Sequence, residues 1–127
     1  MLNVQQLHFH AAWDKTISPK DRVLIEELFD NTYDEAEDPL MSPILRTAFN
    51  HKHELLVTVL IHNFTHRAVQ FKNRDVQFSA GDDFYEQSFT IPDLIIPAFT
   101  SMPWTFIFTD VDVQSFKNRA EMSLEIL

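Results

Sequence analysis

Histidine is the residue type in this chain best suited to binding a metal. Six histidines are present, and four of them form two pairs separated by one residue: His8 with His10, and His51 with His53. On a β-strand this spacing directs both side chains of a pair to one face. A zinc site needs three or four ligands at short distances, so the pairs form one only if the first strand lies beside the turn carrying the second pair. Otherwise they are exposed polar residues, which is the interpretation we favour.

An acidic segment is the second feature that could bind a cation or a basic partner. Seven Asp and Glu residues lie between Glu26 and Asp38. Acids near a helix C-terminus oppose the helix macrodipole, so helix stability does not explain them. The segment also lacks the regular spacing and the glycine of a calcium-binding loop. A solvated loop is the simplest interpretation, and a cation site or a docking patch for a basic partner is the alternative.

The composition excludes several kinds of site. With no cysteine, the chain has no thiolate nucleophile, disulfide or Cys-based metal centre. It has one glycine, whereas phosphate-binding loops, dinucleotide motifs and nucleophile elbows need several. A net charge of -9 argues against binding nucleic acids or anionic membranes. The sequence therefore designates no catalytic, cofactor-binding or metal-binding residue.

Length and hydropathy indicate a single domain over residues 1–127. A chain of 127 residues with 45% hydrophobic residues and 12 phenylalanines is large enough for one core and unlike a disordered segment. It contains no apolar run long enough to span a bilayer. Its first residues lack the basic and apolar regions of a signal peptide, so we expect a cytoplasmic protein.

The elements that would position any site start from a predicted central strand at Glu54–Asn63. Its Val, Leu, Ile and Thr content suits a buried strand, and Asn63 is expected to hydrogen-bond the following turn. Residues Ser18–Asp30 predict a helix, with Ser18 as the N-cap and Pro19 in its first turn. Its apolar stripe, expected to cover the sheet, consists of Leu24, Ile25, Leu28 and Phe29.

Shorter patterns predict the remaining strands. A bulge is expected near residues 72–73, and Gly81 with Asp82 marks a hairpin turn. The expected strands are Asn3–His10, Pro43–Phe49, Ala68–Phe71 with Arg74–Ala80, Phe84–Ile91, Ser101–Thr109 and Glu121–Leu127. Ala11–Ile17, Pro92–Pro97 and Asp110–Arg119 are expected as connections, the second with Leu94, Ile95 and Ile96 turned inward. The fold class is an immunoglobulin-like antiparallel β-sandwich of about seven strands with one N-terminal α-helix.

Two tryptophans are expected in the core rather than in a ligand site. Trp104 shares a strand face with Phe106 and Phe108, and large aromatic side chains supply much of a small core. We predict that Trp104 is buried and that the helix packs nearby. Pro103 cannot donate to a strand ladder, so this end of the strand is expected at a sheet edge.

Several of these segments together resemble the SLAP domain, from the S-layer assembly protein of the accessory Sec system in Gram-positive bacteria. The resemblance extends from Leu7 to Phe108. It departs from the family at His62, where the family often has Arg. The similar segments are Leu7-His8 with Trp13, Ser18 with Asp21 and Arg22, Leu28-Phe29, Val59–Asn63, Val69–Phe71, Ile96-Pro97 and Ser101–Phe106.

The resemblance implies a non-enzymatic protein-interaction domain linked to accessory Sec-dependent secretion or cell-surface assembly. Its partner would be a component of the secretion machinery or a protein that the machinery exports. A second hypothesis is a metal-binding protein or metal-dependent enzyme that uses the His8/His10 and His51/His53 pairs and the acidic segment. A third is a self-associating module in which strand edges pair in a homodimer.

Overall fold

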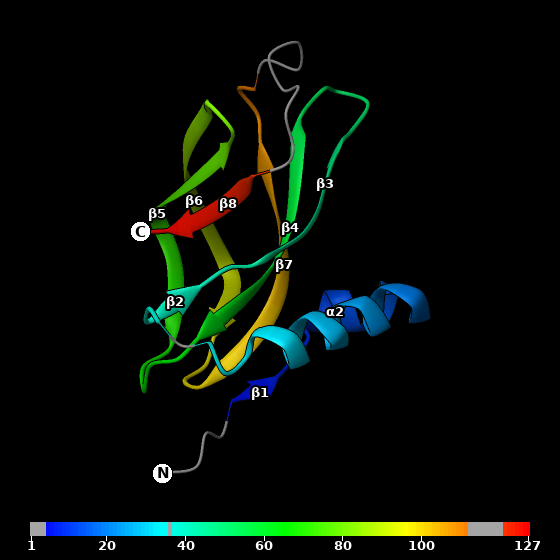
Figure 1. The fold of residues 1–127 in the computed structure, drawn as a ribbon, viewed down its shortest axis with the longest axis vertical. Coiled ribbons are helices and arrows are strands. Elements are labelled where there is room, and N and C mark those ends of the chain that lie inside the picture. Colours follow the sequence, from blue (N-terminus) through cyan, green and yellow to red (C-terminus); the bar gives the residue numbers. More distant parts are fainter. Residues whose placement is uncertain (1–4, 36, 112–120) are drawn as a thin grey trace.

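The computed structural model describes residues 5–35, 37–111 and 121–127. The strands in these parts form two facing sheets, with helices outside one of them (Figure 1). This mainly β architecture confirms the predicted sandwich. The elements are β1 (Gln6–Leu7), α1 (Ala11–Thr16), α2 (Pro19–Thr32), β2 (Leu40–Met41), β3 (Ile44–Phe49), β4 (Leu55–Asn63), β5 (Val69–Ala80), β6 (Asp83–Ile96), β7 (Thr100–Phe108) and β8 (Met122–Ile126).

The first sheet is built around β4, as its apolar run predicted. β4 pairs antiparallel with β7 along its whole length, from Leu55 opposite Phe108 to Asn63 opposite Thr100. β3 pairs with the other side of β4 as the expected hairpin. On that same side, past the end of β3, β2 pairs with the last two residues of β4. β1 pairs with β7 in parallel orientation, so the sandwich is not antiparallel throughout.

The second sheet has the order β6-β5-β8. Gly81, with a φ of 61°, lies in the tight turn between β5 and β6, as the sequence predicted. β8 pairs antiparallel with β5, which confirms a strand near the C-terminal end of the sequence. The connection expected at residues 110–119 lies outside the described residues from 112 onward.

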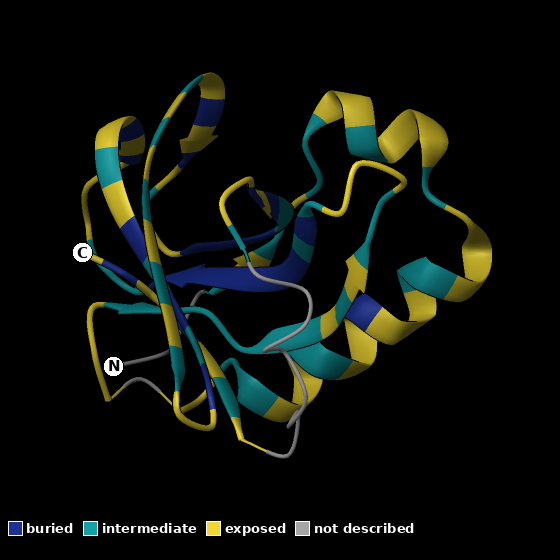
Figure 2. Ribbon diagram, turned by 90° about the horizontal axis from the view of Figure 1, so that it is seen from above, coloured by how far each residue is buried: buried dark blue, intermediate teal, exposed yellow. Residues whose placement is uncertain are grey.

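Side chains from the facing sides of both sheets form the core. In Figure 2 the buried residues, drawn dark blue, lie mostly along the strands. β4 contributes its odd-numbered residues, and β7 contributes Phe106 and Phe108. Phe89 of β6 meets both of these rings edge-on, with centroids 5.1 and 5.5 Å away. Such edge-to-face geometry stabilises aromatic pairs beyond the burial of their area.

The even-numbered face of β4 is covered by α2. Leu60 and His62 on this face are 0% exposed, and Ile25 of the helix is 1% exposed. The predicted N-cap is confirmed, because Ser18 Oγ accepts a hydrogen bond from the Asp21 backbone N–H at 3.1 Å. Leu24 was expected in the buried stripe but is 36% exposed, since it lies about 100° around the helix from Ile25.

A bidentate ion pair links the start of α2 to β3. Both guanidinium N–H groups of Arg46 donate to the Asp21 carboxylate at 3.0 Å. These hydrogen bonds lower the pKa of Asp21. The main contacts of the helix in the sheet are with β3 and β4.

The N-terminal segment differs most from its prediction. From residue 5 onward its strand covers Gln6–Leu7, while residues 3–4 of the predicted strand lie outside the described residues; residues expected as a connection form α1 instead. Trp13 of α1 stacks on Trp104 with ring centroids 6.5 Å apart, and His10 meets the same ring at 5.4 Å. Trp104 was predicted to be buried and is partly buried: it packs against the core, and these two rings lie against it.

Candidate interaction surface

The structure places the two histidine pairs at different levels along β4. His51 and His53 lie in the turn before Leu55, whereas β1, which precedes His8, pairs with β7 beside Asn63. His10 meets Trp104, which pairs with Val59 in the middle of β4, so His10 is separated from the Leu55 end by roughly 13 Å at about 3.3 Å per residue. Because metal ligands must converge within a few Å, the pairs do not combine into one site.

His8 and His10 also do not share a strand face, because β1 ends before them. His8 Nε2 bonds Gln6 Oε1 at 3.1 Å, and His10 Nδ1 accepts from the Ala12 backbone N–H at 3.1 Å as the N-cap of α1. Within residues 5–35, 37–111 and 121–127, no three His, Asp or Glu side chains are grouped closely enough to hold a metal ion.

The only histidine within the core layers of the described chain takes part in a buried hydrogen-bond chain. His62 Nδ1 lies 2.5 Å from Ser101 Oγ, and its Nε2 lies 2.7 Å from Thr32 Oγ1. Thr32 Oγ1 donates to the Leu28 carbonyl at 2.6 Å, so it accepts from His62 Nε2. Ser101 then donates to Nδ1 and accepts from Gln5 Nε2 at 2.9 Å.

This serine–histidine pair is structural. Both residues are 0% exposed, so no substrate reaches them. Burial lowers the pKa of His62 from 6.5 to about 4, which keeps the ring neutral, as the chain of donors and acceptors requires. The chain joins β4, β7, α2 and the residue before β1, and it fixes the helix to the sheet.

Asn63 closes the end of β4, as predicted. Its Nδ2 donates to the carbonyls of Arg67, Ile96 and Pro97 at 2.8 to 3.1 Å. Its Oδ1 accepts from the backbone N–H and the hydroxyl of Thr65 at 3.0 and 2.7 Å. The side chain is 0% exposed and joins two neighbouring loops, which is a structural role.

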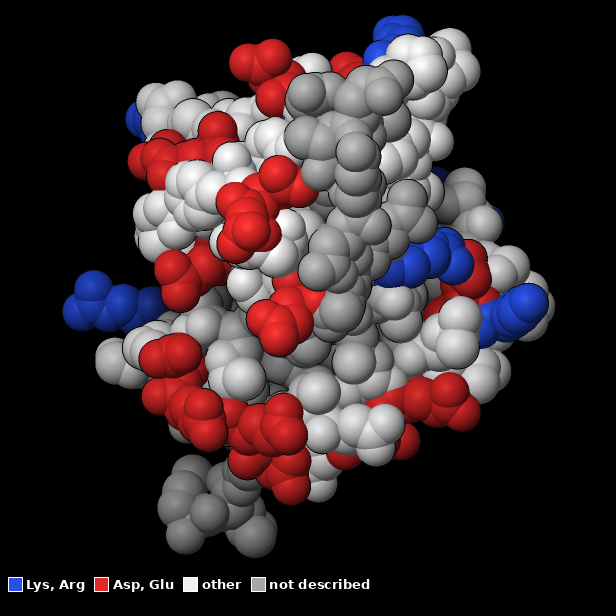
Figure 3. All heavy atoms as spheres, turned by 45° about the horizontal axis from the view of Figure 1, so that its top comes forward, with Lys and Arg blue, Asp and Glu red and all other residues white. Residues whose placement is uncertain are grey.

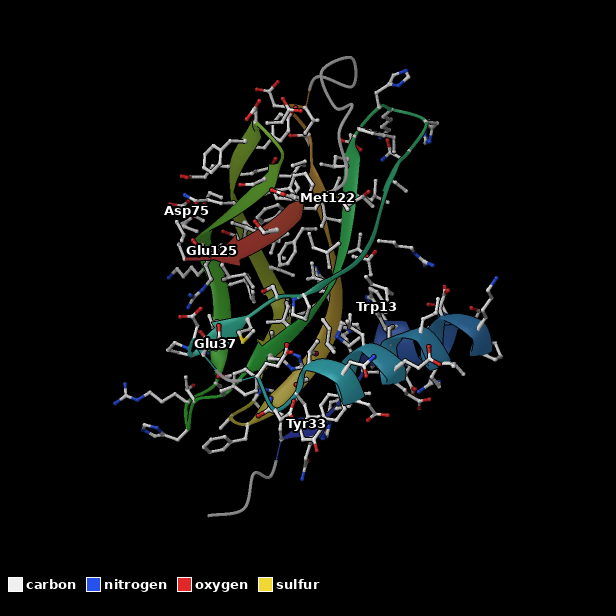
Figure 4. All side chains as sticks on the ribbon, in the orientation of Figure 1. Trp13, Tyr33, Glu37, Asp75, Met122 and Glu125 are labelled. Atoms are coloured by element: carbon white, nitrogen blue, oxygen red, sulfur yellow. The ribbon has the colours of Figure 1, made fainter. Side chains whose placement is uncertain are left out.

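All seven acidic residues of the segment are exposed. On the face drawn in Figure 3, acidic side chains outnumber basic ones. Figure 4 places Glu37, before β2, and Glu125, on β8, on the same side of the molecule. Asp38 and Glu125 line a shallow depression of about 270 Å³ with Leu40. This arrangement agrees with the solvated loop and with a docking patch alike.

The edge of β7 that faces away from β4 is hydrogen-bonded by β1 at one end and by Gln87 at the other. Leu60 N–H donates to the Pro43 carbonyl, so Leu60 shares no backbone hydrogen bond with its partner Pro103 on β7. The backbone of Pro103 therefore points away from β4, toward the sheet edge, as expected from the sequence. β1 pairs only with Thr100 and Ser101. Farther along, the Gln87 amide from β6 donates to the Ile107 carbonyl at 3.1 Å and accepts from the Thr109 N–H at 3.0 Å. Nothing in the sequence marked Gln87 for this role.

β6 is the edge strand of the second sheet, and its pairing with β5 is irregular at one place. Phe71 pairs with Ile91, but Gln70 pairs with Ile95, so three residues of β6 bulge out between them. On β5 the ladder shifts again before Arg74, at the bulge predicted near residues 72–73. The segment Pro92–Pro97 is therefore strand rather than connection up to Ile96, and the proline marks the bulge.

The two bulges enclose an apolar pocket of about 380 Å³. The buried side chains of Phe71 and Leu94 line its interior. Ile95, expected to point inward, lines it with 46% of its surface exposed, because the bulge reverses the alternation of the strand. Asn73, at a φ of 50°, lies in the β5 bulge and is hydrogen-bonded to Thr90 of β6. The Asn73 N–H donates to Thr90 Oγ1 at 2.9 Å, and the Thr90 hydroxyl donates to Asn73 Oδ1 at 3.2 Å.

The fold and this surface define a β-sandwich domain with an apolar pocket at a sheet edge. The SLAP domain family matches residues 7–124. The chain therefore belongs to the SLAP domain family. No curated protein and no solved structure matches it. No helix in the described parts has the length and apolar character needed to cross a membrane.

Proposed function

We propose that this SLAP domain is a non-enzymatic protein-interaction module linked to accessory Sec-dependent secretion or to cell-surface protein assembly. Membership of the family supports the link to secretion. The non-enzymatic character is supported by the burial of the serine–histidine pair and by the separation of the histidine pairs. A cytoplasmic location belongs to the same proposal.

The observation that favours an interaction function is the exposed edge of β6 with its apolar pocket. An edge strand offers unpaired backbone groups to an extended partner segment, and a neighbouring pocket adds specificity for a side chain. Natural proteins usually protect long edges, as Gln87 protects β7 here. The bulged part of β6 instead combines an open edge with exposed Ile95.

Affinity capture tests this function. The tagged domain is incubated with a lysate of its source cells, and bound proteins are identified by mass spectrometry against tag alone and against heat-unfolded domain. We expect a secretion component or an exported surface protein to be enriched on the folded domain only. Enrichment equal to that on the unfolded control would reject an interaction function.

A further inference from the structure

The pocket between the β5 and β6 bulges has a chemistry that selects its occupant, and this inference rests on the proposed interaction function. Its walls are apolar, because Phe71, Ile91, Leu94 and Ile95 supply most of the lining. The polar residues in the lining are Gln70, Lys72 and Thr90. A large aliphatic or aromatic side chain fits such a concave apolar site better than a polar one does.

The shape of the pocket is fixed before any ligand binds. Phe71 and Leu94 are 2% and 0% exposed, so packing holds the interior. The hydrogen bonds between Asn73 and Thr90 hold the two bulges together. A preformed site binds without the entropic cost of ordering its own walls, which matters for a pocket of this size.

The one charged residue that lines the pocket has the opposite sign to the net charge of the protein. This residue is Lys72, whereas the chain has a net charge of -9. The sequence from Leu55 to Arg74 contains no Asp or Glu, although the chain has 19 of them. A second depression along β5 shares Gln70 and Lys72 with the pocket and adds Arg74 and Asp75. Asp93 lies in the β6 bulge but does not line the pocket.

We propose that the pocket receives a large apolar side chain from an extended protein segment whose flanking residues are acidic. Lys72 attracts the acidic group, and the edge of β6 bonds the backbone of the segment. A basic segment would meet Lys72 with a like charge, and a folded surface would not enter the bulge. Arg74 lines the neighbouring depression rather than the pocket, and its guanidinium donates to the carbonyls of Leu127 and Gln70 at 2.8 and 2.9 Å.

Binding of labelled synthetic octapeptides to the purified domain, followed by fluorescence polarisation, tests this proposal. The peptides carry a central Leu, Phe or Ser between acidic, basic or neutral flanks. We expect the acidic peptides with Leu or Phe to bind more tightly than those with Ser or with basic flanks. Absence of binding by the acidic set up to about 1 mM, or equal binding by the basic set, would overturn the proposal.

Two substitutions with matched controls localise the binding. Lys72→Glu should lower the affinity for acidic peptides at least about 3-fold and raise the affinity for basic ones. Lys52→Glu, in the exposed turn before β4, should change neither affinity. Ile95→Asp should abolish binding, and Phe84→Asp, at another exposed position of β6, should not. Equal effects of a substitution and its control would reject the pocket as the site.

The same variants separate this inference from the proposed function. If affinity capture succeeds equally with Ile95→Asp and with the unaltered domain, the pocket is not the docking site and the interaction function stands. If capture fails with the unaltered folded domain, the interaction function itself fails. Loss of the captured partner with Ile95→Asp alone would support both.

Discussion

Removing the titration of His62 should reduce the acid sensitivity of the domain. Burial lowers the pKa of His62 from 6.5 to about 4. Below pH 6.5 the unfolded chain therefore binds a proton at this residue, while the folded chain does not until about pH 4. The stability associated with neutral His62 is complete above pH 6.5 and is lost progressively as the pH falls toward 4.

The size of this effect follows from the pKa difference. Each tenfold difference in proton affinity corresponds to about 1.4 kcal/mol, so the loss is about 3 kcal/mol at most. A domain of this size has a free energy of unfolding of roughly 5–15 kcal/mol, so the change is measurable. Water entering near Thr32 or Ser101 would make it smaller.

Urea unfolding of the wild type and of His62→Gln between pH 7.5 and 4, followed by tryptophan fluorescence, measures this loss. Glutamine retains neutral polar groups but does not titrate, so the other histidines and the carboxylates cancel in the comparison. We expect the wild type to lose more stability than the variant as the pH falls. Parallel pH profiles for the two proteins would show that His62 titrates normally in the fold, and would refute the buried neutral ring.

Three further perturbations test the packing and the histidines. Asn63→Ala removes the hydrogen bonds that join two loops and should cost about 3 kcal/mol or more, measured by thermal unfolding; an unchanged melting temperature would contradict its role. Trp104→Ala should cost roughly 2–4 kcal/mol in urea unfolding, because the ring is only partly buried; wild-type stability would mean that it is not packed. Zinc should leave the melting temperature unchanged, because no three His, Asp or Glu side chains among the described residues are grouped closely enough to bind it, and stoichiometric zinc would disprove that interpretation.

Local patterns in the sequence predicted those elements whose signals are contained in a few neighbouring residues. The apolar run of β4, the Ser18 cap of α2 and the Gly81 turn depend on backbone geometry within one segment. Asn63 was predictable for the same reason, since a polar residue at a strand end commonly bonds the adjacent turn.

Features that depend on distant neighbours were predicted less well. The burial of Trp104 depends on residues far away in the sequence, because His10 and Trp13 lie against its ring. The exposure of Ile95 follows from the register shift between β5 and β6, which neither strand specifies alone. The pocket needs both bulges opposite each other, and only one of them was visible in the sequence.

Site-specific photo-crosslinking in the source cells tests the proposed interaction surface in its native setting. A photoreactive phenylalanine analogue replaces Ile95, at the pocket, or Phe84, which lies on the same strand and is 56% exposed. We predict that the probe at position 95 crosslinks a distinct protein and that the probe at position 84 does not. Absence of a crosslink at position 95, or the same crosslinks at both positions, would contradict a partner-binding surface at the bulge of β6.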